Sequence, residues 1–192
     1  LGKDLEGSCG KRVAILISLD TPSTDITSKD DETTELLKAT GRWVERLVPL
    51  SGGQQMIVAS MYGFSGASAD PQEYANNEKL IAAAIMRMKA MKGTPYYLAT
   101  DLNIDPSGSQ ILQTAINAQL VYDIVDDACG GHPLPTFKRG GISSNMEGPG
   151  TSRIDTILGN QAATHACMQV QYMYQGAAIF DHVPIQLTLN MY

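Results

Sequence analysis

Polar residues of several chemical types follow apolar runs at four places in the sequence, where extended segments would end. These places are Met61-Tyr62-Gly63, Thr100-Asp101-Leu102-Asn103, Ser152-Arg153-Ile154-Asp155 and Phe180-Asp181-His182. Alternation along an extended chain puts Asp101 and Asn103 on the same side if the extended conformation continues through both. The two side chains could then face one ligand.

These residue types match the needs of metal-assisted attack on a phosphodiester. The reaction requires anionic oxygens for Mg²⁺ or Mn²⁺, a carboxylate to orient or deprotonate water, a neutral donor for phosphoryl oxygens, and a group that titrates near neutral pH. The five residues that supply these groups are Asp101, Asn103, Asp155, Asp181 and His182. Pairing with Asp155 or Asp181 would raise the pKa of His182 above its reference value of about 6.5, so a cationic histidine could contact a phosphate at pH 7.

Strands and two helices are the elements that must position these residues. Short apolar and β-branched runs predict strands, which are residues 11–19, 41–50, 55–62, 94–100, 152–158, 167–173 and 183–189, with a brief strand at Thr136-Phe137 inside a long loop at 130–150. We expect the first three strands to be antiparallel. Asp70 followed by Pro71 and Glu73 predicts the start of a helix that ends near Gly93, and Asp105-Pro106 predicts a second helix to about Ala118. The acidic stretch 25–35 indicates a solvated loop, and the whole pattern indicates packed sheets with helices outside.

The bulk composition limits the classes of protein that fit. A length of 192 residues predicts one domain. A net charge of −6 and a pI near 4.9 argue against binding nucleic acid through the overall charge of the protein. Three cysteines without a close-spaced pair, no membrane-length apolar run and no signal peptide predict a soluble intracellular protein, cytoplasmic or nuclear. Because the first residue is Leu1, we expect the chain to begin inside a longer product.

Three of the motifs, in order, carry a family resemblance. The strings TDLN at 100–103, SRID at 152–155 and FDHVPIQLTL at 180–189 resemble the G-D-x-N, R-[IL]-D and S-D-H-x-P-[IV] motifs of the endonuclease/exonuclease/phosphatase superfamily. MYG at 61–63 resembles that superfamily's N-x-Y segment, and Thr136-Phe137 resembles its T-[FW] pair. The matches extend from about Val13 to Leu189. The resemblance implies an α/β (α+β) fold, a two-sheet β-sandwich flanked by helices and deoxyribonuclease-I-like, with the active site at one end.

The resemblance also implies roles for the polar residues. Asp101 would position the attacking water or a metal, Asn103 would orient the phosphate, and Asp181 would be a second carboxylate near the metal. His182 would contact the scissile phosphate, with Asp155 as its orienting partner. The implied cofactor is Mg²⁺ or Mn²⁺, and the implied partner is a phosphodiester substrate, nucleic acid among the options.

Two further predictions concern the rim of this site. By the same resemblance, Tyr62 would supply a hydroxyl on the phosphate side. Arg153 is a candidate for binding phosphate, within a local basic patch that would also contain Arg12, Lys138 and Arg139. Scattered surface cations explain each of these four residues at least as well.

The sequence departs from the superfamily at its N-terminal side. The superfamily begins with a strand that ends in Asn and a second strand carrying a Glu that is the main metal ligand. Only ten residues precede Lys11 here, and Glu6 lies in a Gly-rich segment, so the metal-ligand role does not transfer to it. Ser60 and Thr100 stand where the motifs usually have Asn and Gly. We therefore expect a single domain over residues 1–192 that is N-terminally incomplete and corresponds to the C-terminal two-thirds of the fold.

Several functional interpretations remain open from the sequence. The first is a nuclease-like, divalent-metal-dependent phosphodiester hydrolase. The alternatives are a noncatalytic or incomplete domain of a longer polypeptide, and a phosphatase acting on a small or lipid phosphate. A zinc site from Cys129, His132, His165 and Cys167 is less favoured than ordinary buried thiols, because the second pair is too closely spaced for one tetrahedral ion. The oligomeric state is not predicted.

Overall fold

A six-stranded mixed sheet lies at the centre of the protein in the computed structural model, which describes residues 7–9, 13–26, 32–139, 146, 150–174 and 181–190. Its strands, in spatial order, are β3 (Thr24–Asp25), β4 (Trp43–Pro49), β5 (Gln55–Tyr62), β6 (Tyr96–Asp101), β10 (Asp155–Gly159) and β7 (Tyr122–Asp123). Only β5 and β6 are parallel, and the other neighbouring pairs are antiparallel. The strands β5, β6 and β10 therefore form the middle of the sheet.

Three helices cover one face of this sheet. They are α1 (Glu32–Ala39), α2 (Pro71–Ala90) and α3 (Gln110–Asn117), with short 3-10 turns η1 (Ser51–Gly53) and η2 (Pro106–Gly108). The predicted start of α2 is confirmed, because the Asp70 side chain accepts hydrogen bonds from the backbone N–H groups of Gln72 and Glu73. The main hydrophobic core lies between these helices and the sheet, around fully buried Ile81 and Leu98. Burial of this apolar surface fixes the helices against the sheet.

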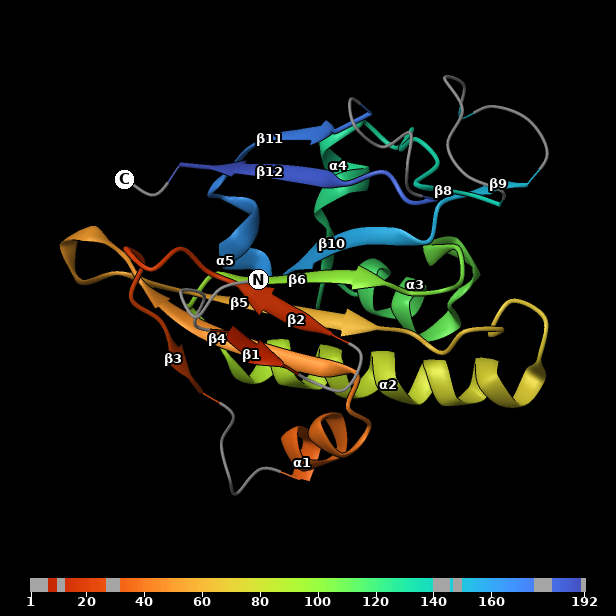
Figure 1. The fold of residues 1–192 in the computed structure, drawn as a ribbon, viewed down its shortest axis with the longest axis horizontal. Helices are drawn as coiled ribbons and strands as arrows, with labels where there is room; N and C mark the ends of the chain where they lie inside the picture. Colours follow the sequence, from red (N-terminus) through yellow and green to blue (C-terminus); the bar gives the residue numbers. More distant parts are fainter. Residues whose placement is uncertain are drawn as a thin grey trace.

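Two strand pairs lie over the opposite face, with a space between them. One pair is β1 (Gly7–Cys9) with β2 (Ala14–Leu16), and the other is β11 (Cys167–Tyr172) with β12 (Ile185–Leu189). Val13 and Ile15 pack on Val44 and Val58, which places β2 over β4 and β5. The second pair packs with the short helix α4 (Ile124–Ala128) over β10, while α5 (Gln161–Thr164) joins β10 to β11. Figure 1 shows α2 on one side of the sheet and β11 and β12 on the other.

The remaining pair, β8 (Phe137–Lys138) with β9 (Thr151–Ser152), lies close to the start of β10. The layered α/β architecture, with sheets packed together and helices outside, is the predicted one. Two local predictions were wrong. The predicted first strand forms a ladder with β1 and not with β4. The predicted loop over 25–35 contains the first turn of α1, whose Leu37 is fully buried in the core.

Candidate active site

Three candidate residues form a row across the middle strands of the central sheet. Tyr62 ends β5 and is the register partner of Asp101 on β6, and Asp101 is in turn the register partner of Asp155 on β10. Register partners on neighbouring strands project from the same face of a sheet. The strand order therefore brings together side chains that are 39 and 54 positions apart in the sequence.

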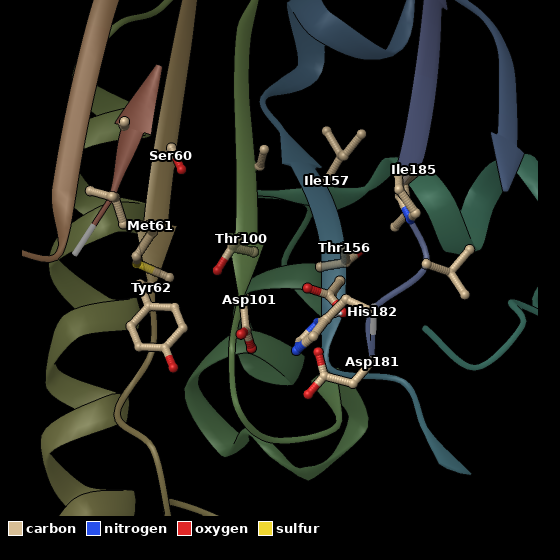
Figure 2. Close-up of a pocket in the computed structure, with 16 residues that line it drawn as sticks. Ser60, Met61, Tyr62, Thr100, Asp101, Thr156, Ile157, Asp181, His182 and Ile185 are labelled. Atoms are coloured by element: carbon tan, nitrogen blue, oxygen red, sulfur yellow. Dashed lines mark hydrogen bonds and ion pairs between the residues drawn. The ribbon is translucent and has the colours of Figure 1, made fainter. Parts of the chain in front are cut away.

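This row lies at one end of a cleft of about 640 Å³ between β2 and β12. The cleft is polar at this end. Asp181 and His182, which belong to the segment that leads into β12, lie there beside the row. Figure 2 shows the side chains of Asp101, Asp181 and His182 directed toward one another, with the Tyr62 ring across from them. The structure therefore brings together five of the seven predicted site residues.

The Asp155 carboxylate and the His182 ring form a hydrogen-bonded pair. His182 Nδ1 lies 2.9 Å from Asp155 Oδ2, and because a carboxylate only accepts, Nδ1 carries the donated proton. This hydrogen bond is the main cause of a raised His182 pKa, with the Asp155 charge adding to it and burial acting against it. The other ring nitrogen, Nε2, remains for a ligand. The backbones of His182 and Phe137 form an isolated antiparallel β-bridge, and the centroids of their rings are 5.1 Å apart. These contacts help to hold the His182 ring.

The Asp101 carboxyl has a raised pKa. Burial raises its pKa to about 6, and repulsion from Asp155 adds to this shift. The backbone N–H of Asn103, 2.9 Å from Asp101 Oδ1, partly offsets it, as does the positive charge on His182. A carboxylate in such a position would gain from a nearby cation.

The donor set of the site fits a divalent cation in part. Asp101, Asp155 and His182 each offer one ligand atom, and these atoms all lie within 4.8 Å of one another. Carboxylate oxygens are the ligands that Mg²⁺ and Mn²⁺ prefer, but the Asp155 oxygen is already bonded to His182. Asp181, which is exposed and lines the same cleft, is the remaining carboxylate. Asp101 and Asp181 are thus the residues that could hold such an ion.

Asn103 does not share the face of Asp101 by strand alternation. β6 ends at Asp101, and Asn103 has a φ of 54°, so the extended conformation that this prediction required does not continue. The Asn103 Nδ2 donates to the Gly63 carbonyl at 3.2 Å and links the segments that follow β5 and β6. Asn103 is absent from the cleft lining and borders the site from this turn.

Arg153 is directed away from the cleft, so the structure does not bring it to the other residues of the predicted site. Its NH2 group lies 2.6 Å from Asp123 Oδ2 and 2.9 Å from Thr156 Oγ1. Thr156 follows Asp155 along β10, so its side chain points to the opposite face of the sheet. The guanidinium charge of Arg153 is therefore paired with the Asp123 carboxylate inside the fold. Of the other cations of the predicted basic patch, Arg12 lies outside the described residues.

Polar residues that were not predicted hold the ends of β5 and β6 together. Asn77 on α2 is fully buried, accepts from the Phe64 N–H at 3.1 Å and donates to the Leu102 carbonyl at 2.9 Å. Arg42 donates to the Gly63 carbonyl at 2.6 Å. A polar residue within a helical pattern carries no sequence signal for such a role, so Asn77 could not be found from its spacing.

The inner part of the cleft is apolar and lies over the centre of the sheet. Val13, Ala14, Ile157 and Ile185 line its walls. Ala99 on the central strand β6 is exposed here, although both neighbouring strands pair with β6. The polar site therefore opens onto a slot whose lining offers few hydrogen-bonding groups.

The zinc site considered from the sequence receives no support from the described part of the chain. The only cluster of three or more potential metal ligands found there is Asp101, Asp155 and His182, so the four-ligand zinc site is not formed. None of the helices described has the length and apolarity that crossing a bilayer requires.

Comparisons with known proteins identify the fold. No protein-family model matches the sequence, and no curated protein matches it. Among solved structures, the catalytic domain of Xenopus laevis APE2 aligns with a TM-score of 0.68 and 12% identity, over 98% of this chain and 76% of that chain. An AP endonuclease from Archaeoglobus fulgidus aligns with a TM-score of 0.67 and 15% identity, over 98% and 80%. TDP2 of D. rerio, complexed with a single-strand DNA product, aligns with a TM-score of 0.59 and 16% identity, over 98% and 78%. The chain has the endonuclease/exonuclease/phosphatase, or deoxyribonuclease-I-like, fold.

Proposed function

We propose that this chain is a nuclease-like phosphodiester hydrolase that depends on a divalent metal and uses the cleft of Asp101, Asp155 and His182. The observation that carries the proposal is the hydrogen-bonded Asp155–His182 pair facing a half-buried Asp101 carboxylate at one end of a deoxyribonuclease-I-like sheet. Those groups are the acid, base and anionic donor that attack of water on a phosphodiester requires.

His182 is the proposed phosphate contact. With Nδ1 bonded to Asp155, the protonated ring presents Nε2–H toward the cleft as a charged donor. Asp155 favours that cation and fixes the ring orientation, which places the positive charge where the attacked phosphorus gathers negative charge. Tyr62, across the cleft, is the proposed second donor, and its hydroxyl lies 3.1 Å from Ser65 Oγ in the free protein.

Asp101 is the proposed residue that orients the attacking water. Its carboxylate lies between Tyr62 and Asp155 in the row, so a water accepted there would lie beside a phosphate on His182. Mg²⁺ or Mn²⁺, held by Asp101 and Asp181, would neutralise the phosphate and lower the pKa of bound water. Asn103 donates one Nδ2 hydrogen to the Gly63 carbonyl at 3.2 Å, and its second Nδ2 hydrogen is the proposed donor to the phosphate.

Nucleic acid is the proposed substrate class. D. rerio TDP2, which shares this fold, was solved with a single-strand DNA product. Because this chain carries a net charge of −6, we expect weak binding that depends on the metal rather than on a broad basic surface.

One observation favours a second candidate, a noncatalytic domain with this fold. Among the residues that the structure describes, no glutamate lines the cleft, whereas the resemblance assigns the main metal-ligand role to a glutamate. In that case the site would bind phosphodiesters or metal without turning over substrate.

Hydrolysis of plasmid DNA and of bis-p-nitrophenyl phosphate, with and without Mg²⁺, separates the two candidates. We expect Mg²⁺-dependent cleavage that falls at least about 100-fold in Asp101→Ala and in His182→Ala. The matched controls are Asp20→Ala and His132→Ala, which remove the same groups from exposed positions outside the cleft. Equal activity in the wild type and both site variants would refute the site assignment, and no Mg²⁺-dependent activity in the wild type would favour the noncatalytic domain. Faster hydrolysis of p-nitrophenyl phosphate than of the diester would indicate a phosphatase.

A further inference from the structure

The two halves of the Asp155–His182 pair come from segments that no strand ladder connects. Within the described sheets, β10 pairs with β6 and β7, whereas β12 pairs only with β11. Asp155 and His182 are 27 positions apart, yet their side chains meet at 2.9 Å. Something other than sheet register must therefore set this distance.

Thr136 connects both segments through one residue. It is fully buried, and its Oγ1 accepts hydrogen bonds from the backbone N–H groups of Ile154 at 3.1 Å and Asp155 at 3.0 Å. Its carbonyl accepts from the N–H of Val183 at 2.7 Å, directly after His182. Its own N–H donates to the Ser152 carbonyl at 3.0 Å. All four bonds end on residues of the two segments that must meet.

The residues after Thr136 continue the same connection. Phe137 pairs with His182 through the backbone, and the Lys138 N–H donates to the Asp181 carbonyl at 3.0 Å. On its other side, the short strand β8 pairs with β9. This segment therefore lies between the approach to β10 and the approach to β12, with Thr136 at its buried end.

We infer that Thr136 is a positioning residue that sets Asp155 against His182, an inference that rests on the proposed function. The side-chain hydroxyl fixes the Asp155 backbone, and the carbonyl of the same residue fixes the backbone beside His182. A shift in either bond changes the distance and angle between carboxylate and ring. Thr136 contacts neither the proposed water nor the proposed phosphate position, so it acts only through the pair.

The chemistry of the residue gives discriminating variants. Thr136→Val keeps the shape but leaves the two N–H groups of Ile154 and Asp155 without their acceptor. Thr136→Ser keeps the acceptor. Thr40→Val is the matched control, because the Thr40 hydroxyl also bonds two backbone groups, the Leu37 carbonyl and the Arg42 N–H, at the end of α1.

Steady-state kinetics on the diester substrates give the first test. We expect Thr136→Val to lower kcat by about 100-fold with KM changed less than about threefold, because sub-ångström to ångström displacement of catalytic groups costs rate rather than binding. Thr136→Ser should stay within about fivefold of the wild type, and Thr40→Val should leave kcat unchanged. Wild-type kcat in Thr136→Val, or an equal loss in Thr136→Ser and Thr136→Val, would overturn the inference.

A spectroscopic test separates this inference from the proposed function. In protein labelled with ¹⁵N-histidine at pH 7, the hydrogen-bonded Nδ1–H of His182, assigned by its loss in His182→Gln, should appear in the wild type and Thr136→Ser and vanish in Thr136→Val. If the wild type lacks activity but this pattern holds, the function fails and the positioning role stands. If the signal persists in folded Thr136→Val, the positioning role fails. If Thr136→Val does not fold, hydrogen exchange of the Ile154 and Asp155 amides in the wild type decides, and unprotected amides would overturn the role.

Discussion

Asp101 and Asp155 are register partners on the antiparallel strands β6 and β10, so two carboxylates project from the same face of the sheet at the end of the cleft. Burial, with the repulsion between the two carboxylates added to it, raises the pKa of Asp101 to about 6. His182 offsets part of this repulsion by donating a hydrogen bond to Asp155. The site thus concentrates negative charge in the free protein, an arrangement that favours a metal cation but weakens the fold.

Replacing Asp101 by Asn should stabilise the free protein at neutral pH. Because the folded-state pKa of Asp101 is above its usual 3.8, the folded state binds more protons than the unfolded state between pH ~4 and ~6. Its contribution to stability therefore falls as pH rises through that window. We expect Asp101→Asn to raise the free energy of unfolding at pH 7.5 by about 1 kcal/mol, after allowing for solvent screening, and to change it little at pH 4. Urea unfolding in EDTA at both pH values measures this, with Asp20→Asn as the control, and an unchanged or lower stability at pH 7.5 would contradict it.

The pH profile of activity should move to lower pH when Asp155 is replaced by Asn. In the wild type, kcat/KM should rise as Asp101 ionises near pH 6 and fall where His182 loses its proton, above the ordinary histidine pKa. Asp155 raises both pKa values, that of Asp101 by repulsion and that of His182 by hydrogen bonding and charge. Residual activity of Asp155→Asn, measured from pH 5 to 9, should therefore show both limbs shifted down. If neither limb of the pH profile moved, Asp155 would not control the pKa values of Asp101 and His182.

The residues of the site were largely predictable because each lies at one end of a strand with a clear apolar pattern or in the segment that leads into such a strand. Once the strands β5, β6 and β10 pair, their register places Tyr62, Asp101 and Asp155 in one row. Asn103 and Arg153 were less predictable, since one departs from extended geometry at a φ of 54° and the other pairs with Asp123, which is distant in sequence. Such partners are not encoded in local spacing.

The missed elements share a physical cause, which is that they depend on tertiary contacts. Within α1, whose charged residues favoured a loop, only Thr34 and Leu37 are buried. The helix α4 has five residues, too few for periodicity to show. Thr136 did carry a signal, its place in the T-[FW] pair, but its four hydrogen bonds appear only once the segments meet.

Divalent metal should stabilise the wild type through Asp101 and Asp181. A ligand that binds only the folded state adds about 1.4 kcal/mol to the free energy of unfolding when its concentration is ten times Kd. We expect Mg²⁺ or Mn²⁺ to raise the melting temperature of the wild type, and EDTA to reverse the change. Asp101→Ala and Asp181→Ala should lose most of this increase, while Asp20→Ala should keep it. Equal stabilisation of all four proteins would place the ion elsewhere.

Gly63 should tolerate no side chain, because the turns after β5 and β6 meet at this residue. A Cβ placed there would lie 2.3 Å from the Leu102 carbonyl oxygen and 2.8 Å from Asn77 Oδ1, well inside contact distance. The Gly63 N–H also donates to the Asp101 carbonyl at 2.6 Å, so any movement away from Leu102 strains the end of β6 itself. We expect Gly63→Ala to lower the free energy of unfolding by roughly 1–3 kcal/mol and to reduce the activity of the molecules that remain folded. Gly108→Ala, at a position with open space around the new methyl group, should change stability by less than about 0.5 kcal/mol. Chemical denaturation and specific activity of both variants measure the difference, and a Gly63→Ala protein with wild-type values would show that these turns are not held in close contact.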